Sequence, residues 1–218
     1  MRMSDERRIA EGIASWLHFE FCCCRGKVLD ESALKSSVSQ LLGSLPATRG
    51  ALVYSNYAHP DLRRRFKTGR KPEVDYAVVY KHGPDSTPSV EYAVECKWAD
   101  SSHTNGSRIV KDFLRLVALH NLSGKRTECF FVLAGSIVNL KKTLSLDIFR
   151  TANPKSKLIP KQRGMGKVKI SDMPSTVQSG AISLFPSIQE FSVNCTGKVF
   201  DQQDIKELTF QAIVWRIV

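Results

Sequence analysis

Two spacings of apolar residues alternate along this chain of 218 residues, and they separate its expected helices from its expected strands. Apolar residues at every third or fourth position indicate an amphipathic helix, whereas alternation, or a short run rich in Val, Tyr, Phe and Ile, indicates a strand. The helical spacing predicts helices at residues 4–21, 29–42 and 108–120. The strand pattern predicts strands at residues 50–57, 74–80, 90–98, 129–135, 191–193 and 207–218.

The order of these segments predicts a mixed sheet. Gly83-Pro84-Asp85 is a turn signal between strands 74–80 and 90–98, which therefore form a hairpin. The helix at 108–120 leads to the run at 129–135, which is apolar throughout and typical of a strand buried on both faces. We expect a single α/β domain over residues 1–218, with helices flanking a mixed β-sheet. The C-terminal strands close the sheet, and the last of them is a candidate for its edge.

The net charge of +11 favours an anionic partner, of which nucleic acid is the first candidate. One basic segment comes directly before the strand at 74–80, and a second spans about residues 150–180, where Lys and Arg are mixed with Pro and Gly. We predict that the second is a long basic loop or flexible insertion able to hold a nucleic-acid backbone, with a disordered segment as the alternative. The first segment either contacts phosphates or is a solvated loop. Its basic residues are Arg63, Arg64, Arg65, Lys67, Arg70 and Lys71.

Other features of the composition narrow the class of protein. No apolar run reaches the ~20 residues that span a membrane, and the N-terminus lacks a secretory signal, so we expect a cytoplasmic protein with no membrane partner. The six cysteines lack the spacing of zinc ligands, although three are consecutive at Cys22-Cys23-Cys24. We therefore expect reduced and mostly buried thiols rather than disulfides or a zinc site.

Acidic and basic residues in the hairpin indicate chemistry. Asp75 is the single acid in the otherwise apolar run at 74–80, and Glu95 and Lys97 alternate onto one face of the strand at 90–98. Two carboxylates on adjacent strands suit Mg²⁺, which prefers oxygen ligands and binds phosphate oxygens well. A lysine beside the bound water could orient it, help to deprotonate it or neutralise charge on the phosphate. The pattern suits metal-assisted phosphodiester hydrolysis.

Asp75, the nineteen residues that follow it, and then Glu95-Cys96-Lys97 resemble the PD-(D/E)xK nuclease superfamily, which includes restriction endonucleases. The sequence departs from the family pattern because Asp75 does not directly follow a proline, and Glu73 is the alternative acid. The resemblance covers about residues 28–135 and implies a restriction-endonuclease-like core. It implies that Asp75 and Glu95 bind the metal, that Lys97 activates or positions water, and that the Cys96 backbone carbonyl is a further metal ligand.

Two helices extend the resemblance. Many of these nucleases place a glutamate on the helix before the first core strand, and Leu29, Glu31 and Leu34 fit that pattern, so Glu31 would support the metal. Alternatively, Glu31 is only a favourable charge in the first turn of a helix. The run Lys-Asp-x-x-Arg-Leu at 111–116 is similar to the helix after the acid-x-Lys strand in several of these families. Alternatively, Lys111 or Asp112 simply pairs with Arg115 along the helix.

The sequence and its resemblance together predict a nuclease that hydrolyses phosphodiester bonds with Mg²⁺, for which Mn²⁺ can substitute. We expect DNA as the substrate, with RNA left open. The alternative is a non-catalytic nucleic-acid-binding module on the same fold. A homodimer is left open, as is the choice between endonuclease and exonuclease.

Overall fold

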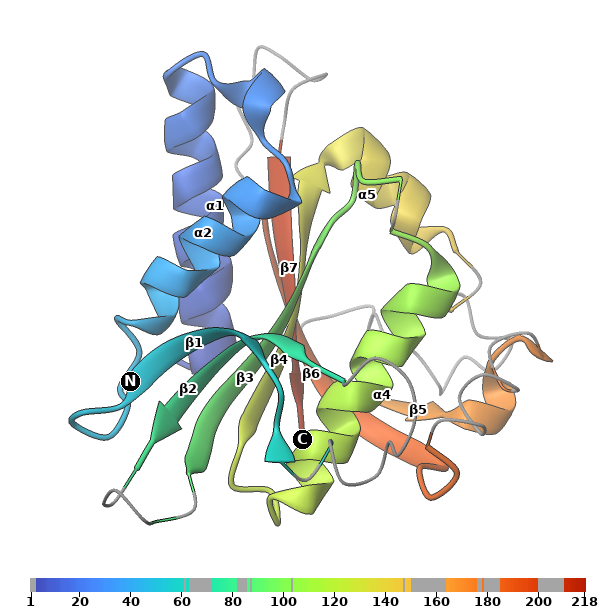
Figure 1. Ribbon diagram of the computed structural model, residues 1–218. Coiled ribbons are helices and arrows are strands. Elements are labelled where there is room, and N and C mark those ends of the chain that lie inside the picture. The colour runs from blue at the N-terminus through green and yellow to red at the C-terminus, as the bar shows by residue number, and fades with distance from the viewer. Residues whose placement is uncertain are drawn as a thin grey trace.

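A seven-stranded mixed sheet forms the centre of the computed structural model, with helices on both of its faces (Figure 1). The structure describes residues 3–60, 62, 72–81, 86, 88–102, 104–146, 148–149, 164–175, 178, 185–199 and 210–218. The helices are α1 (Asp5–Cys22), α2 (Glu31–Leu42), α4 (Gly106–Leu122) and α5 (Ile137–Leu144), with short 3₁₀ turns η1 (Gly26–Val28) and η2 (Ile170–Asp172). The strands are β1 (Leu52–Tyr57), β2 (Val74–Tyr80), β3 (Ser89–Trp98), β4 (Glu128–Ser136), β5 (Gly164–Lys169), β6 (Glu190–Val199) and β7 (Phe210–Ile217).

The strand order is β1-β2-β3-β4-β7-β6-β5. β3 and β4 are parallel, and α4 connects them, whereas every other neighbouring pair is antiparallel. A parallel pair needs such a crossover because a tight turn cannot return the chain to the same end of the sheet. The α/β class and the flanked mixed sheet predicted from the sequence are therefore present.

Local sequence explains where the two helices nearest the hairpin begin. The Asp30 side chain accepts a hydrogen bond from the Ala33 backbone N–H at 2.8 Å and caps α2. The Asn105 side chain accepts one from the Arg108 N–H at 3.0 Å and caps α4 in the same way. Each cap satisfies one of the N–H groups that the first turn of a helix leaves without a helical partner. The capping residues Asp30 and Asn105 thereby determine where α2 and α4 begin.

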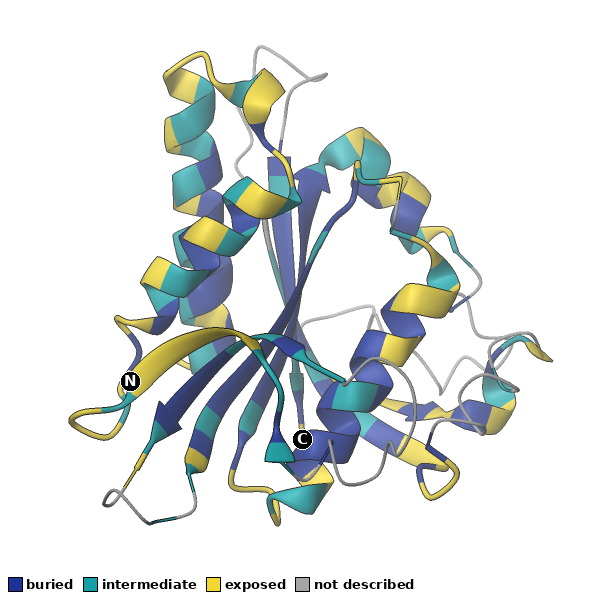
Figure 2. Cartoon of the chain, in the orientation of Figure 1, coloured by how far each residue is buried: buried dark blue, intermediate teal, exposed yellow. Residues whose placement is uncertain are grey.

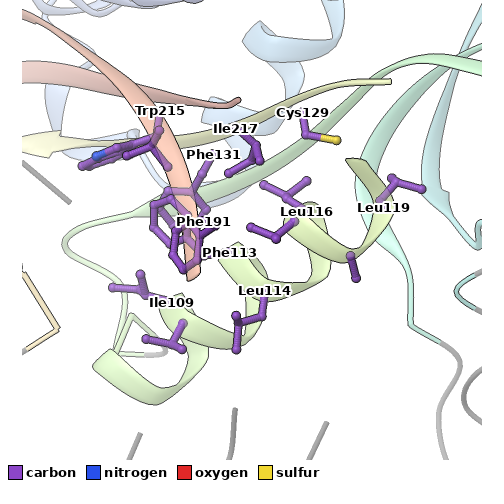
Figure 3. Packing of buried hydrophobic residues seen from close by; sticks show 14 of the residues in the cluster. Ile109, Phe113, Leu114, Leu116, Leu119, Cys129, Phe131, Phe191, Trp215 and Ile217 are labelled. Carbon is purple, nitrogen blue, oxygen red and sulfur yellow. The ribbon is translucent and has the colours of Figure 1, made fainter. Parts of the chain in front are cut away.

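The sheet separates two apolar layers. α1 and α2 cover one face, where Ile13, Leu34 and Val94 belong to one buried cluster. α4 covers the other face, and its Phe113 stacks on Phe131 of β4 with ring centroids 4.3 Å apart (Figure 3). β4 is buried along nearly its whole length (Figure 2), as its continuous apolar run predicts.

The structure differs from the predicted elements in three places. β7 is not at an edge but lies between β4 and β6, and the edges of the sheet are β1 and β5. Residues 164–169, predicted as part of a basic loop, form strand β5, while most of residues 150–163 and 176–184 fall outside the described residues. The third difference is helix α5, which the apolar spacing did not predict.

None of the six cysteines, all of which are described, forms a disulfide, and only Cys96, Cys129 and Cys195 are buried. Cys22, Cys23 and Cys24 are exposed at the end of α1, so the expectation of mostly buried thiols is only half right. In the part of the chain that the structure describes, no helix is both long and apolar enough to cross a membrane.

We expect Phe131→Ala to lower the free energy of unfolding by about 3–5 kcal/mol, because it removes a fully buried ring from the layer beneath α4. Phe19→Ala is the matched control, since the Phe19 side chain is 57% exposed and the Arg25 guanidinium lies over its ring. Its cost should stay below about 1 kcal/mol. Urea denaturation of the two variants checks this, and equal losses would contradict the layer assignment.

Candidate active site

The hairpin of β2 and β3 brings the two predicted acids together. Tyr76 is the register partner of Val94, so Asp75 and Glu95 are the next residues along these antiparallel strands. The Cys96 backbone N–H donates a hydrogen bond to Asp75 Oδ2 at 2.8 Å. A side-chain carboxylate thus accepts the N–H of β3 at the point where the regular pairing of the two strands ends. Asp75 is thereby held against the Glu95-Cys96-Lys97 segment.

Lys35 of α2 joins Asp75 to Glu31. Its Nζ lies 2.9 Å from Asp75 Oδ1 and 2.9 Å from Glu31 Oε1. Burial alone would lower the pKa of Lys35, but the hydrogen bonds and charges of Asp75 and Glu31 outweigh it and raise that pKa. A permanent positive charge therefore lies between the two carboxylates. The sequence analysis missed Lys35, although its spacing of four residues from Glu31 on a helix was a signal for an ion pair.

Arg115 of α4 neutralises Glu95. Its Nη1 forms an ion pair with the Glu95 carboxylate, donates to the Glu73 backbone carbonyl at 2.9 Å, and lies 3.3 Å from Asp112 Oδ1. The pairing of Asp112 with Arg115 along the helix, which was the structural alternative for this motif, is present. Glu73, the alternative to Asp75, enters this cluster through its backbone carbonyl.

Lys97 is the innermost lysine of the cluster. Its Nζ lies 3.1 Å from Asp112 Oδ2 and donates to the Cys96 backbone carbonyl at 3.2 Å. Burial would lower the pKa of Lys97, but the charges of Asp112, Asp75 and Glu95 raise it. The ammonium therefore keeps its proton at neutral pH and can donate hydrogen bonds or stabilise negative charge. Of the roles predicted for Lys97, proton abstraction from water is the one this environment disfavours.

Glu95 is 2% exposed, and burial raises its pKa well above the ordinary value. The charge of Arg115 lowers this pKa, while those of Asp112 and Asp75 raise it further. Burial also raises the pKa of the neighbouring Cys96 thiol, which is packed among the apolar residues beneath α1 and α2. That thiol is on the opposite face of β3 from Glu95 and Lys97, as strand alternation requires.

A cleft of about 470 Å³ opens beside this cluster. Glu31 of α2 and Lys97 of β3 both border the cleft, together with residues of α4 and of the loop before it. The remaining lining residues are Ser101, Arg108, Lys111, Asp112 and Arg115. Glu31 and Lys97 thus line one cavity. Asp75 and Glu95 do not line it and are connected to its wall through the ion pairs of Lys35 with Glu31 and of Arg115 with Glu95. The basic residues Arg63, Arg64, Arg65, Lys67, Arg70 and Lys71 lie outside the described residues.

The donor atoms suit a hard cation in kind, because Asp75, Glu31 and the Cys96 carbonyl supply only oxygen. Their present partners, however, are the ammonium groups of Lys35 and Lys97. Among the described residues, no group of three or more His, Cys, Asp or Glu side chains is arranged to hold a metal ion. A metal at this position would have to displace Lys35 or bind the carboxylate oxygens that these cations leave available.

The pKa shift of Glu95 predicts a pH dependence of stability. A pKa raised in the folded state favours folding below the ordinary glutamate pKa, and this contribution is lost as pH rises towards the raised value. The loss is at most about 1.4 kcal/mol per pH unit within that window. Glu95→Gln removes the titration, so the free energy of unfolding of wild type minus that of the variant should fall as pH rises.

Urea denaturation of both proteins at intervals from about pH 4.5 to 8 measures this difference. A difference that stays constant across the range would mean that Arg115 keeps Glu95 ionised throughout.

No protein-family model, curated protein or solved structure matches this chain. The contacts of the cleft and the resemblance of the Asp75 and Glu95-Cys96-Lys97 motif are therefore the basis for assigning a function.

Proposed function

We propose that this chain is a Mg²⁺-dependent nuclease that hydrolyses phosphodiester bonds of DNA, built on a restriction-endonuclease-like core. The supporting observation is the position of Asp75, whose carboxylate accepts the Cys96 N–H and so lies against Glu95-Cys96-Lys97. Glu31 joins the same cluster through Lys35. Glu31, Asp75 and the Glu95-Cys96-Lys97 segment are distant from one another in sequence and come from one helix and two strands, yet they belong to one charged cluster.

In this proposal Asp75, Glu95, Glu31 and the Cys96 carbonyl hold the metal. The ion, when bound, supplies charge stabilisation for the phosphate and a more acidic water. The Lys97 ammonium, with its raised pKa, donates hydrogen bonds to the attacking water or to a phosphate oxygen. Mn²⁺ is expected to replace Mg²⁺, since it accepts the same oxygen ligands.

Lys35 and Arg115 hold the acids in place until the cation binds. Each forms an ion pair with a carboxylate that is mostly or fully buried, so these negative charges are never left alone in the interior. Leaving one partner of a buried pair uncompensated typically costs about 3–5 kcal/mol. These cations therefore keep the acid cluster compatible with a stable fold.

One specific observation favours a second candidate, a nucleic-acid-binding module without catalysis. Asp75 and Glu95 are already neutralised by Lys35 and Arg115, and the described residues include no ready group of three metal ligands. Such a protein would use the basic cleft for binding and would need no metal. Metal binding by Asp75 is the property that separates the two candidates.

Cleavage is the direct test of the nuclease. We expect purified protein to cut plasmid or single-stranded DNA with Mg²⁺ or Mn²⁺, and not with EDTA. Lys97→Ala should lower the rate by about 10²–10³-fold, the usual effect of removing one donor that stabilises the transition state. Lys142→Ala, at an exposed position on α5, is the control and should cut at the wild-type rate. Equal rates for Lys97→Ala and wild type would refute the role of Lys97.

Metal binding can be tested without measuring activity. Mg²⁺ at ten times its dissociation constant should stabilise the folded wild type by about 1.4 kcal/mol. Asp75→Asn should abolish this effect, while its amide oxygen still accepts the Cys96 N–H and preserves the hairpin. Thermal unfolding with and without Mg²⁺ measures the shift. The binding module would be favoured if Mg²⁺ does not change the unfolding temperature of the wild type and the wild type still binds DNA in EDTA.

A further inference from the structure

We propose that the exposed outer part of α4, with Arg108 and Lys111, binds backbone phosphates of the nucleic acid that enters the cleft. The proposal extends the proposed function by assigning the substrate-binding wall of that same cleft. It concerns residues other than the basic segment at 63–71.

Four charged residues share one face of α4. Residues three or four apart on a helix are neighbours, so Arg108, Lys111, Asp112 and Arg115 form one stripe along it. All four line the cleft. Figure 2 shows buried and exposed positions alternating along α4, and within this stripe Asp112 is buried while Arg108 and Lys111 are exposed.

The residues of this stripe differ in their partners. Arg115 and Asp112 form an ion pair with each other. In addition, Arg115 pairs with Glu95, and Asp112 pairs with Lys97. The side chains of Arg108 and Lys111 have no hydrogen-bond or ion-pair partner among the described residues. Each acid around the cleft is thus already in an ion pair with Lys35, Lys97 or Arg115. Arg108 and Lys111 lie outside these pairs and line the cleft.

Arg108 and Lys111 lie near the beginning of a helix. Arg108 lies in the first turn of α4 and Lys111 in the second, directly after the Asn105 cap. The helix dipole is positive at this end, which favours anions there by about 0.3–1 kcal/mol. Two cations without a partner among the described residues, the helix dipole and a concave surface therefore all favour an anion at one place.

A polymer with several phosphates fits this arrangement better than a single anion. Arg108 and Lys111 are separated by about 4.5 Å along the helix axis, given the helical rise per residue. Arg108 and Lys111 are neighbours on the helix surface and have long side chains, so they can contact successive phosphates of one strand. Lys97 lies in the same cleft, where the scissile phosphate would bind. A phosphodiester chain provides phosphates for both places at once.

The test compares two double variants. The variant Arg108→Gln with Lys111→Gln removes the proposed contacts. The control variant Lys125→Gln with Arg126→Gln also removes one arginine and one lysine, but from the turn that follows the C-terminal end of α4. All four positions are exposed, so both variants should fold, which their circular dichroism spectra and unfolding temperatures will verify. Binding of a fluorescent DNA duplex is measured by anisotropy in EDTA over a range of salt concentrations.

We expect the first variant to bind more weakly and to reduce the slope of log K against log salt by about 1.8, or about 0.9 for each lost phosphate contact. The control variant should keep the wild-type slope. Equal slopes for wild type and the Arg108 and Lys111 variant would overturn the proposal, as would equal losses in both variants or an absence of DNA binding by wild type at low salt.

These outcomes are distinguishable from a failure of the proposed nuclease. Cleavage of DNA by wild type, with an unchanged slope in the Arg108 and Lys111 variant, would leave the nuclease standing and place its phosphate contacts elsewhere. A reduced slope in that variant, with no cleavage by wild type in Mg²⁺ or Mn²⁺, would leave the binding wall standing and refute the nuclease.

Discussion

The hydrogen bond from the Cys96 backbone N–H to the Asp75 carboxylate is the contact on which the geometry of the charged cluster depends. It fixes an acid of β2 against β3, where the regular pairing of the two strands ends. From that point β3 continues beside β4 alone, in parallel, as far as Trp98. Lys35 of α2 and Arg115 of α4 contact the acids of the two strands at this point.

Charge balance is the second constraint. Burial raises the pKa of Glu95 and would lower those of Lys97 and Arg115, so each group alone would resist ionisation in the interior. Together they compensate one another, and the pKa values of both cations are raised. The cluster is thus cooperative, because removing one member leaves its partner with an unmatched buried charge. This explains why the network reaches across α2, the hairpin and α4 rather than consisting of isolated pairs.

The sequence predicted the local parts of this arrangement well. β2 begins and ends at the predicted residues, because Val74–Tyr80 is apolar and strand-like on both sides of a single acid. Side chains alternate between the two faces of a strand, so the sequence predicted that Glu95 and Lys97 share one face of β3 and that Cys96 lies on the other. The predicted edge position of β7 was wrong because strand order depends on pairing between distant segments, and the apolar sequence of β7 fits an interior strand as well as an edge. β5 escaped prediction because its Gly and Lys residues resemble a loop.

The partners of the acids could not be read from the sequence for a different physical reason. Lys35 and Arg115 each have an acid nearby on their own helix, so their spacing predicts ordinary surface pairs. Their contacts with Asp75 and Glu95 instead depend on the angle at which each helix crosses the sheet, which is set by the apolar layers on either side. On α4 this angle turns Arg115 towards Glu95 and leaves Arg108 and Lys111 at the opening of the cleft. The charged stripe of α4 therefore has two parts. Asp112 and Arg115 form ion pairs with β3, whereas Arg108 and Lys111 are exposed at the opening of the cleft.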